Sequence, residues 1–99
     1  MAQLTLRNGP LKGSVFSVPK GTVLIGRASD CLVQLDDLRV SRHHCALTFD
    51  GRDLVIRDMG SGSGTWVNNR PVGMCQTILQ HGYTFSVTET IFHVDLGTP

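Results

Sequence analysis

Short apolar runs separated by turn-forming residues recur along the chain, and they restrict its possible folds more than any other feature. Such runs occupy residues 4–6, 15–18, 23–25, 32–35, 46–49 and 54–56, and more follow Trp66. Several alternate apolar with polar residues, and nearly all are bounded by Gly, Pro, Asn or Asp, as expected for half-buried strands. The eleven glycines and four prolines leave no convincing apolar stripe at helical spacing. We predict an all-β sandwich in which any helix is a single turn.

Length and composition indicate one folded domain. The 99 residues are enough for a sandwich core but fewer than chains that usually divide into two domains. Hydrophobic residues make up 40% and charged residues 17%, which is typical of globular proteins and not of disordered segments. Asp50 and Gly51 lie between two of the apolar runs and predict a tight hairpin. We expect a single domain over residues 1–99, and a domain of this size is compatible with a module of a longer protein.

Charge and cysteine content exclude several classes of function. The net charge of +1 and the scattered positions of nine Lys and Arg residues argue against nucleic-acid binding. The odd set Cys31, Cys45 and Cys75 fits reduced thiols better than a disulfide framework. The first residues lack a signal-peptide pattern, and no apolar run approaches the roughly 18 residues of a membrane span. We expect no membrane association and an intracellular, cytoplasmic location.

Three segments carry side chains suited to binding phosphate. They are Gly26-Arg27, then Ser-Arg-His-His at 41–44, then Gly-Ser-Gly-Thr-Trp-Val-Asn at 62–68. In this order they resemble the forkhead-associated (FHA) domain, and the resemblance covers nearly the whole chain. It implies a β-sandwich of two mainly antiparallel sheets, with about eleven short strands and the recognition loops at one end. It also implies a module that reads phosphothreonine in Ser/Thr kinase signalling.

Arg27, Ser41 and Arg42 are the predicted phosphate-binding residues. Arg27 directly follows an apolar strand, so the sheet would fix its backbone while the guanidinium binds two phosphate oxygens. Ser41 offers a hydroxyl donor, and the adjacent Arg42 adds a second cation. Arg39 lies nearby and is expected to favour acidic residues beside the phosphothreonine. Alone, each would be read as a surface or turn residue; the combination favours an anion site.

Two structural braces and one peptide-contact loop complete the predicted site. By resemblance, His44 is a buried, neutral histidine that braces one recognition loop against another, and we assign a bracing role to Asn68 as well. The glycine-rich segment Gly62, Ser63, Gly64 and Thr65 would let the backbone approach a bound peptide. Here the chain departs from the family pattern Asn-Gly-Thr, because Ser63 replaces the asparagine that contacts the peptide backbone. We expect this change to weaken peptide binding without abolishing phosphate capture.

Other chemistries fit the sequence less well. The glycines at 60–64 lack the lysine of a P-loop and the spacing of a dinucleotide fingerprint. His43, His44 and Cys45 are adjacent, and neighbours on a strand point to opposite faces, so they predict no metal site. Ser41, His44 and Asp58 have spacing that suits a braced loop better than a catalytic triad. We therefore expect no cofactor, no metal and no enzymatic activity.

Two functions remain at this point. The first is phosphothreonine recognition, with a phosphorylated protein or peptide as partner and a Ser/Thr kinase or its substrate in the same pathway. The second is an FHA-fold scaffold that binds an unmodified partner, suggested by Ser63 and by strand edges able to pair with another chain. Dependence on the phosphate group distinguishes the two.

Overall fold

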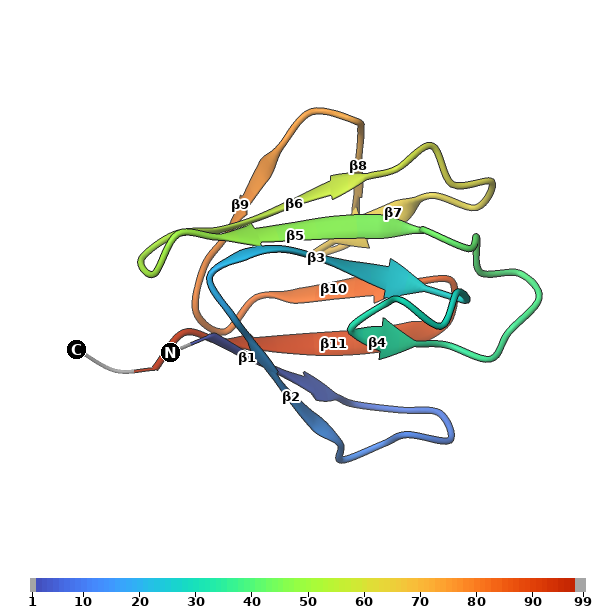
Figure 1. The fold of residues 1–99 in the computed structure, drawn as a ribbon, viewed down its shortest axis with the longest axis horizontal. Coiled ribbons are helices and arrows are strands. Elements are labelled where there is room, and N and C mark those ends of the chain that lie inside the picture. Colours follow the sequence, from blue (N-terminus) through green and yellow to red (C-terminus); the bar gives the residue numbers. More distant parts are fainter. Residues whose placement is uncertain (1, 98–99) are drawn as a thin grey trace.

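Side chains alternate along the strands so that each sheet has one apolar face. In β1 (Ala2–Leu6), Ala2, Leu4 and Leu6 are buried, whereas Gln3 and Thr5 between them are half-buried. A two-residue period of this kind is the signature of a strand with one face in a core. The computed structural model describes residues 2–97, and Figure 1 shows that their strands form two sheets packed face to face.

The strands divide into a six-stranded and a five-stranded sheet. The first contains, in spatial order, β2 (Val15–Val18), β1, β11 (Thr90–Asp95), β10 (Thr84–Val87), β7 (Thr65–Val67) and β8 (Arg70–Val72). The second contains β4 (Val33–Gln34), β3 (Gly21–Gly26), β5 (Cys45–Phe49), β6 (Leu54–Asp58) and β9 (Thr77–Leu79). Among the strand pairs of residues 2–97, β3 and β4 are parallel and all the others are antiparallel. The predicted sandwich of about eleven strands in two mainly antiparallel sheets is confirmed.

Aromatic and aliphatic side chains from both sheets fill the space between them. Phe85 of β10 and Phe92 of β11 are register partners whose rings stack with centroids 4.7 Å apart. Ile25, Leu47 and Ile56 from the five-stranded sheet are fully buried against the same core. Burying each such side chain contributes about 1.5–3 kcal/mol, so the core gives the loops a stable support.

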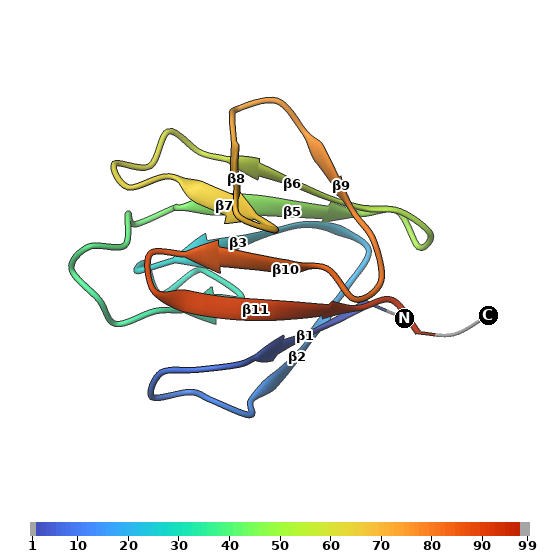
Figure 2. The ribbon, with the colours of Figure 1, turned by 180° about the vertical axis from the view of Figure 1, so that it is seen from behind.

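The connecting loops gather at two opposite ends of the sandwich. One end holds the β3–β4, β4–β5 and β6–β7 loops, to the right in Figure 1, together with the β1–β2 and β10–β11 turns. The view from behind in Figure 2 shows the same separation, with the β5–β6 hairpin at the far end. In that hairpin the residue with positive φ is Gly51, and the Asp50 carboxylate accepts hydrogen bonds from the Arg52 and Asp53 amides. Within residues 2–97 there is no helix long and apolar enough to cross a membrane.

Candidate functional site at the loop end of the sandwich

Arg27 leaves the end of β3 with its backbone and part of its side chain fixed. Its amide donates to the carbonyl of Ser41 (3.0 Å), and the Ala28 amide donates to that of Arg42 (3.0 Å). Its Nε donates to the carbonyl of Val40 (3.1 Å). These bonds orient the guanidinium while leaving its two terminal nitrogens for a ligand, an arrangement suited to the oxygens of a phosphate.

Gly26 explains why the β3 end and the 41–42 backbone approach so closely. A Cβ atom at Gly26 would overlap the carbonyl oxygen of Arg42 and lie 2.8 Å from its carbonyl carbon and 2.9 Å from the carbonyl oxygen of Ser41. Backbone atoms cannot move aside as a flexible side chain can. The φ of Gly26 is not positive, so backbone conformation does not require a glycine here. The close contact requires it. This contact joins the two segments that carry Arg27 and Arg42.

His44 connects two recognition loops through its ring. The Ser41 amide donates to Nδ1 (3.1 Å), so Nδ1 is the acceptor, and Nε2 must donate to the Gly64 carbonyl (2.8 Å). The ring is therefore neutral with its proton on Nε2, and its side chain is fully buried. A further bond runs from the Gly62 amide to the Ser41 hydroxyl (3.3 Å). Loops distant in sequence are held together, and the Ser41 hydroxyl can still donate its proton to an anion.

Asp58 organises the glycine-rich β6–β7 loop from within. Its carboxylate accepts bonds from the Gly60 and Ser61 amides (2.9 and 2.8 Å) and from the Ser61 and Thr65 hydroxyls (2.5 and 2.8 Å). The Ser61 hydroxyl in turn accepts from the Gly64 amide (2.9 Å). Burial by itself would raise the pKa of Asp58, but these donors together outweigh it and lower the pKa below the usual aspartate value. The charged carboxylate is therefore a fixed anchor for the loop.

We expect Asp58→Asn to lower the free energy of unfolding by about 2 kcal/mol at neutral pH, because a neutral amide accepts fewer of these bonds. A lowered folded-state pKa stabilises the fold above the unfolded pKa, and this contribution is lost as the pH falls from 3.8 through the folded-state value. The difference between Asp58→Asn and the parent protein should therefore shrink in acid. Denaturant unfolding at neutral pH and at about pH 2.5 measures this difference in the free energy of unfolding. Protonation of the exposed carboxylates affects both proteins equally, so it cancels in the difference. An equal difference at both pH values would contradict the anchoring role.

The structure separates the other predicted site residues into different environments. Gly62 and Ser63 lie exposed in the β6–β7 loop, and the Ser63 hydroxyl reaches the Arg39 carbonyl at 3.4 Å. Thr65 is fully buried with its hydroxyl on Asp58, so its side chain anchors the loop and does not face a peptide. Asn68 lies in the β7–β8 turn at the other end of β7 and exchanges two hydrogen bonds with the backbone of Thr84. It braces a turn against β10, not the recognition loops.

The cations at this end differ in their partners. Arg39 forms ion pairs with Asp37 (2.7 Å) and Glu89 (3.0 Å), and its hydrogen bonds hold the pKa of both carboxyls below their usual values. An acidic flanking residue would have to compete with these two carboxylates. Neither Arg27 nor Arg42 forms an ion pair with a carboxylate of residues 2–97. An anion can therefore engage Arg27 and Arg42 without displacing a carboxylate.

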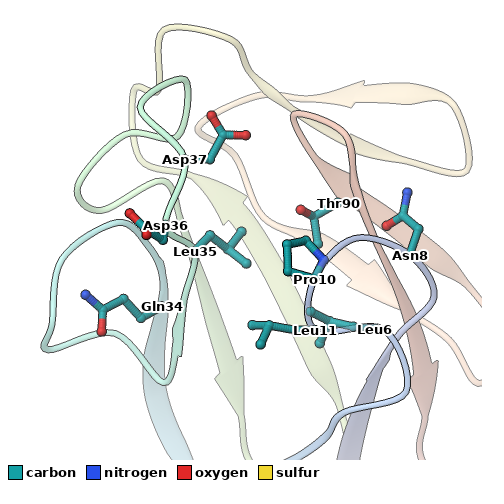
Figure 3. Close-up of a pocket in the computed structure, with 9 residues that line it drawn as sticks. All are labelled: Leu6, Asn8, Pro10, Leu11, Gln34, Leu35, Asp36, Asp37 and Thr90. Atoms are coloured by element: carbon teal, nitrogen blue, oxygen red, sulfur yellow. The ribbon is translucent and has the colours of Figure 1, made fainter.

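A pocket of about 320 Å³ opens at the same end but has different chemistry (Figure 3). Its lining consists of Leu6, Asn8, Pro10, Leu11, Gln34, Leu35, Asp36, Asp37 and Thr90. Four of these nine residues are apolar, and the charged groups of the lining are two aspartates. The two carboxylates of this pocket would repel a phosphate, so the candidate anion site is the group Arg27, Ser41 and Arg42.

The sequence pattern missed two residues that shape the site, Gly26 and Asp58. The Gly-Arg motif gives Gly26 no role of its own, because its contacts are with Ser41 and Arg42, 15 and 16 positions later. The sequence pattern suggests for Asp58 only a triad with Ser41 and His44. An Asp whose side chain meets the amides two and three residues on is a recognised turn signal, and Asp58 with Ser61 fits it.

Comparison with known proteins agrees with this arrangement. The FHA domain family matches residues 23–87. The glycogen accumulation regulator GarA of Mycolicibacterium smegmatis is 39% identical over 71 residues, which are 72% of this chain and 45% of GarA. The chain thus spans less than half the length of this relative.

Two solved structures share the fold over nearly all of the chain. One, an FHA domain studied for phosphothreonine-dependent interactions, has a TM-score of 0.89 and 30% identity, covering 99% of this chain and 98% of its own. The other, Mycobacterium tuberculosis EmbR in complex with a low affinity phosphopeptide, has a TM-score of 0.86 and 26% identity, covering 99% of this chain and 25% of its own. The chain belongs to the FHA domain family.

Proposed function

We propose that this domain binds phosphothreonine peptides in Ser/Thr kinase signalling, with the phosphate held by Arg27, Ser41 and Arg42. One observation carries the proposal: a rigid loop end presents two guanidinium groups without carboxylate partners among residues 2–97, beside a hydroxyl that can donate. Membership of the FHA family and the phosphopeptide complex of a relative support it.

Recognition by this site depends on the phosphate group. A hydrogen bond to a charged group contributes roughly 1.5–3 kcal/mol, and an unmodified threonine offers none of the anionic acceptors. Two or three such bonds account for a difference of two orders of magnitude or more in affinity. The methyl group that separates threonine from serine adds only about 0.8 kcal/mol when buried, or roughly fourfold.

The β6–β7 loop supplies the peptide contacts through Gly62, Ser63 and Gly64. Its backbone is exposed at Gly62, and Asp58 with its donors holds the loop shape. Ser63 can make one hydrogen bond where the asparagine of the family pattern makes two. We assign about 1 kcal/mol, or roughly fivefold in affinity, to this replacement. The partner is a phosphorylated protein, and the domain acts by binding and not by catalysis.

Calorimetric titration with a degenerate phosphothreonine peptide library tests the function. Matched phosphoserine and unphosphorylated libraries serve as controls at one fixed salt concentration, because charged contacts weaken with salt. We expect binding to the phosphothreonine pool, weaker binding to the phosphoserine pool, and none to the unphosphorylated pool. Equal binding to all three, or binding to none, would overturn phosphate recognition and favour the phosphate-independent scaffold.

A further inference from the structure

Three metal-ligating side chains of different kinds meet beside the phosphate-binding surface. Asp30 and Cys31 lie in the β3–β4 loop, and His43 lies in the β4–β5 loop next to Arg42. The His43 Nε2 is 2.9 and 3.1 Å from the two carboxylate oxygens of Asp30. The candidate ligand atoms of all three residues lie within 4.8 Å of one another. His43 is 13 positions from Asp30 and 12 from Cys31, so the fold brings it to the other two.

The donor set matches the preferences of Zn²⁺. Zinc binds cysteine sulfur at about 2.3 Å, histidine nitrogen at about 2.0–2.1 Å and carboxylate oxygen at about 2.0–2.2 Å. Ligand atoms around a tetrahedral ion of these dimensions lie roughly 3.3–3.6 Å apart. The atoms in this cluster need to move by about 1 Å or less to reach that spacing. Three protein ligands leave the fourth position for water.

The thiol distinguishes this cluster from an ordinary ion pair. His81 and Asp95 form a second exposed His–Asp pair, with 3.5 Å between Nδ1 and Oδ1, and no cysteine completes a cluster there among residues 2–97. Cys31 is half-buried, and its Sγ lies 3.4 Å from the carbonyl of Arg42. We propose that Asp30, Cys31 and His43 form a binding site for Zn²⁺ or a cation of similar preference. On binding, the Cys31 thiol gives its proton to solvent and its sulfur to the metal.

Occupancy of this site would alter the adjoining surface in two ways. It would link the β3–β4 and β4–β5 loops, which carry Arg27 and Arg42. Zn²⁺ with one carboxylate, one thiolate and a neutral imidazole has no net charge, whereas the empty cluster with ionised Asp30 has a charge of minus one. A phosphate on Arg27 and Arg42 would therefore experience less repulsion. This consequence rests on the proposed phosphothreonine binding, but the metal site itself does not.

Titration of the tag-free protein with Co²⁺ alone, followed by competition with Zn²⁺, tests the site. We expect a sulfur-to-cobalt charge-transfer absorption at one equivalent of Co²⁺, and its loss when Zn²⁺ is added. Cys31→Ser should remove the absorption, and His43→Ala should weaken binding of Zn²⁺ in calorimetry by roughly tenfold or more. Thermal unfolding establishes that both variants are folded.

Two control variants separate this site from adventitious binding. Cys75→Ser removes the exposed thiol, and His81→Ala removes the other His–Asp pair. Both should retain the absorption and the affinity of the parent protein. Absence of the absorption from the parent protein, or its survival in Cys31→Ser with loss in Cys75→Ser, would overturn the assignment.

The consequence for phosphate binding needs a separate measurement. With Zn²⁺ present at saturation, affinity for a phosphothreonine peptide should rise about fivefold in the parent protein and remain unchanged in Cys31→Ser. Metal binding without this change would retain the site and refute the coupling. Failure of the peptide to bind under any condition would refute the proposed function while the cobalt titration still decides the metal site.

Discussion

Arg27→Ala is expected to weaken phosphothreonine peptide binding by about 100-fold or more while leaving the domain folded. The substitution removes the side chain whose Nε is tied to the Val40 carbonyl and whose terminal nitrogens are left for the phosphate. Two charge-assisted bonds of roughly 1.5–3 kcal/mol each account for the loss. Calorimetric titration with one phosphothreonine peptide measures it, and denaturant unfolding shows whether the variant is folded.

Two further variants serve as controls for Arg27→Ala. Arg52→Ala removes the same charge from the β5–β6 hairpin at the far end of the sandwich, so affinity should remain unchanged (Figure 1). Arg27→Lys retains the charge but loses the planar guanidinium and its bond to Val40. Its affinity for the peptide should lie between those of Arg27→Ala and the parent protein. Unaltered binding by folded Arg27→Ala would refute the site. An equal loss in Arg52→Ala would point to a nonspecific charge effect.

His44→Ala should have the largest effect on stability, lowering the free energy of unfolding by about 3–5 kcal/mol. The substitution leaves a cavity where a fully buried ring stood, and it leaves the Ser41 amide and the Gly64 carbonyl without their partner. Such a loss is a large fraction of the stability of a small domain. Denaturant unfolding followed by tryptophan fluorescence measures it, because Trp66 lies in β7, two residues after Gly64.

The same variant should also bind the phosphopeptide about tenfold more weakly at a temperature where it remains folded, because the buried His44 ring holds the Ser41 amide. His81→Ala is the matched control, since that ring is exposed and lies in the β9–β10 loop at the opposite end. A change in stability of less than about 1 kcal/mol for His44→Ala would refute the bracing role. A loss of the same size in His81→Ala would show that the effect is not specific to the brace.

Much of the fold was predictable because its strands carry their signals locally. Residues 4–6, 15–18, 46–49 and 54–56 alternate or cluster apolar side chains between turn residues, and each lies in a strand of the structure. The apolar run at residues 32–35 predicts a longer strand than β4, because only Val33 and Gln34 pair with β3. Edge strands depend on a neighbour's hydrogen bonds, which no local pattern contains.

Residues of the site were predictable in kind but not in position. The order of Arg27, Ser41, Arg42 and His44 indicated a phosphate-binding end, and the fold places the loops that carry them together. The environment of Thr65 was not predictable, since its burial depends on the carboxylate of Asp58 in the preceding strand. Asn68 likewise bonds to Thr84, which lies 16 residues away in β10.

Strand periodicity, turn residues and motif spacing are local properties, so they were sufficient to infer the all-β class, the family and the types of side chain available to bind an anion. Which atoms meet depends instead on the packing of the two sheets. Gly26 packs against the backbone at 41–42, and His44 bonds to Gly64, because the sheets bring distant loops to one end. The cluster of Asp30, Cys31 and His43 arises in the same way. Contacts between loops depend on how the strands pair and pack, and that is a property of the whole core.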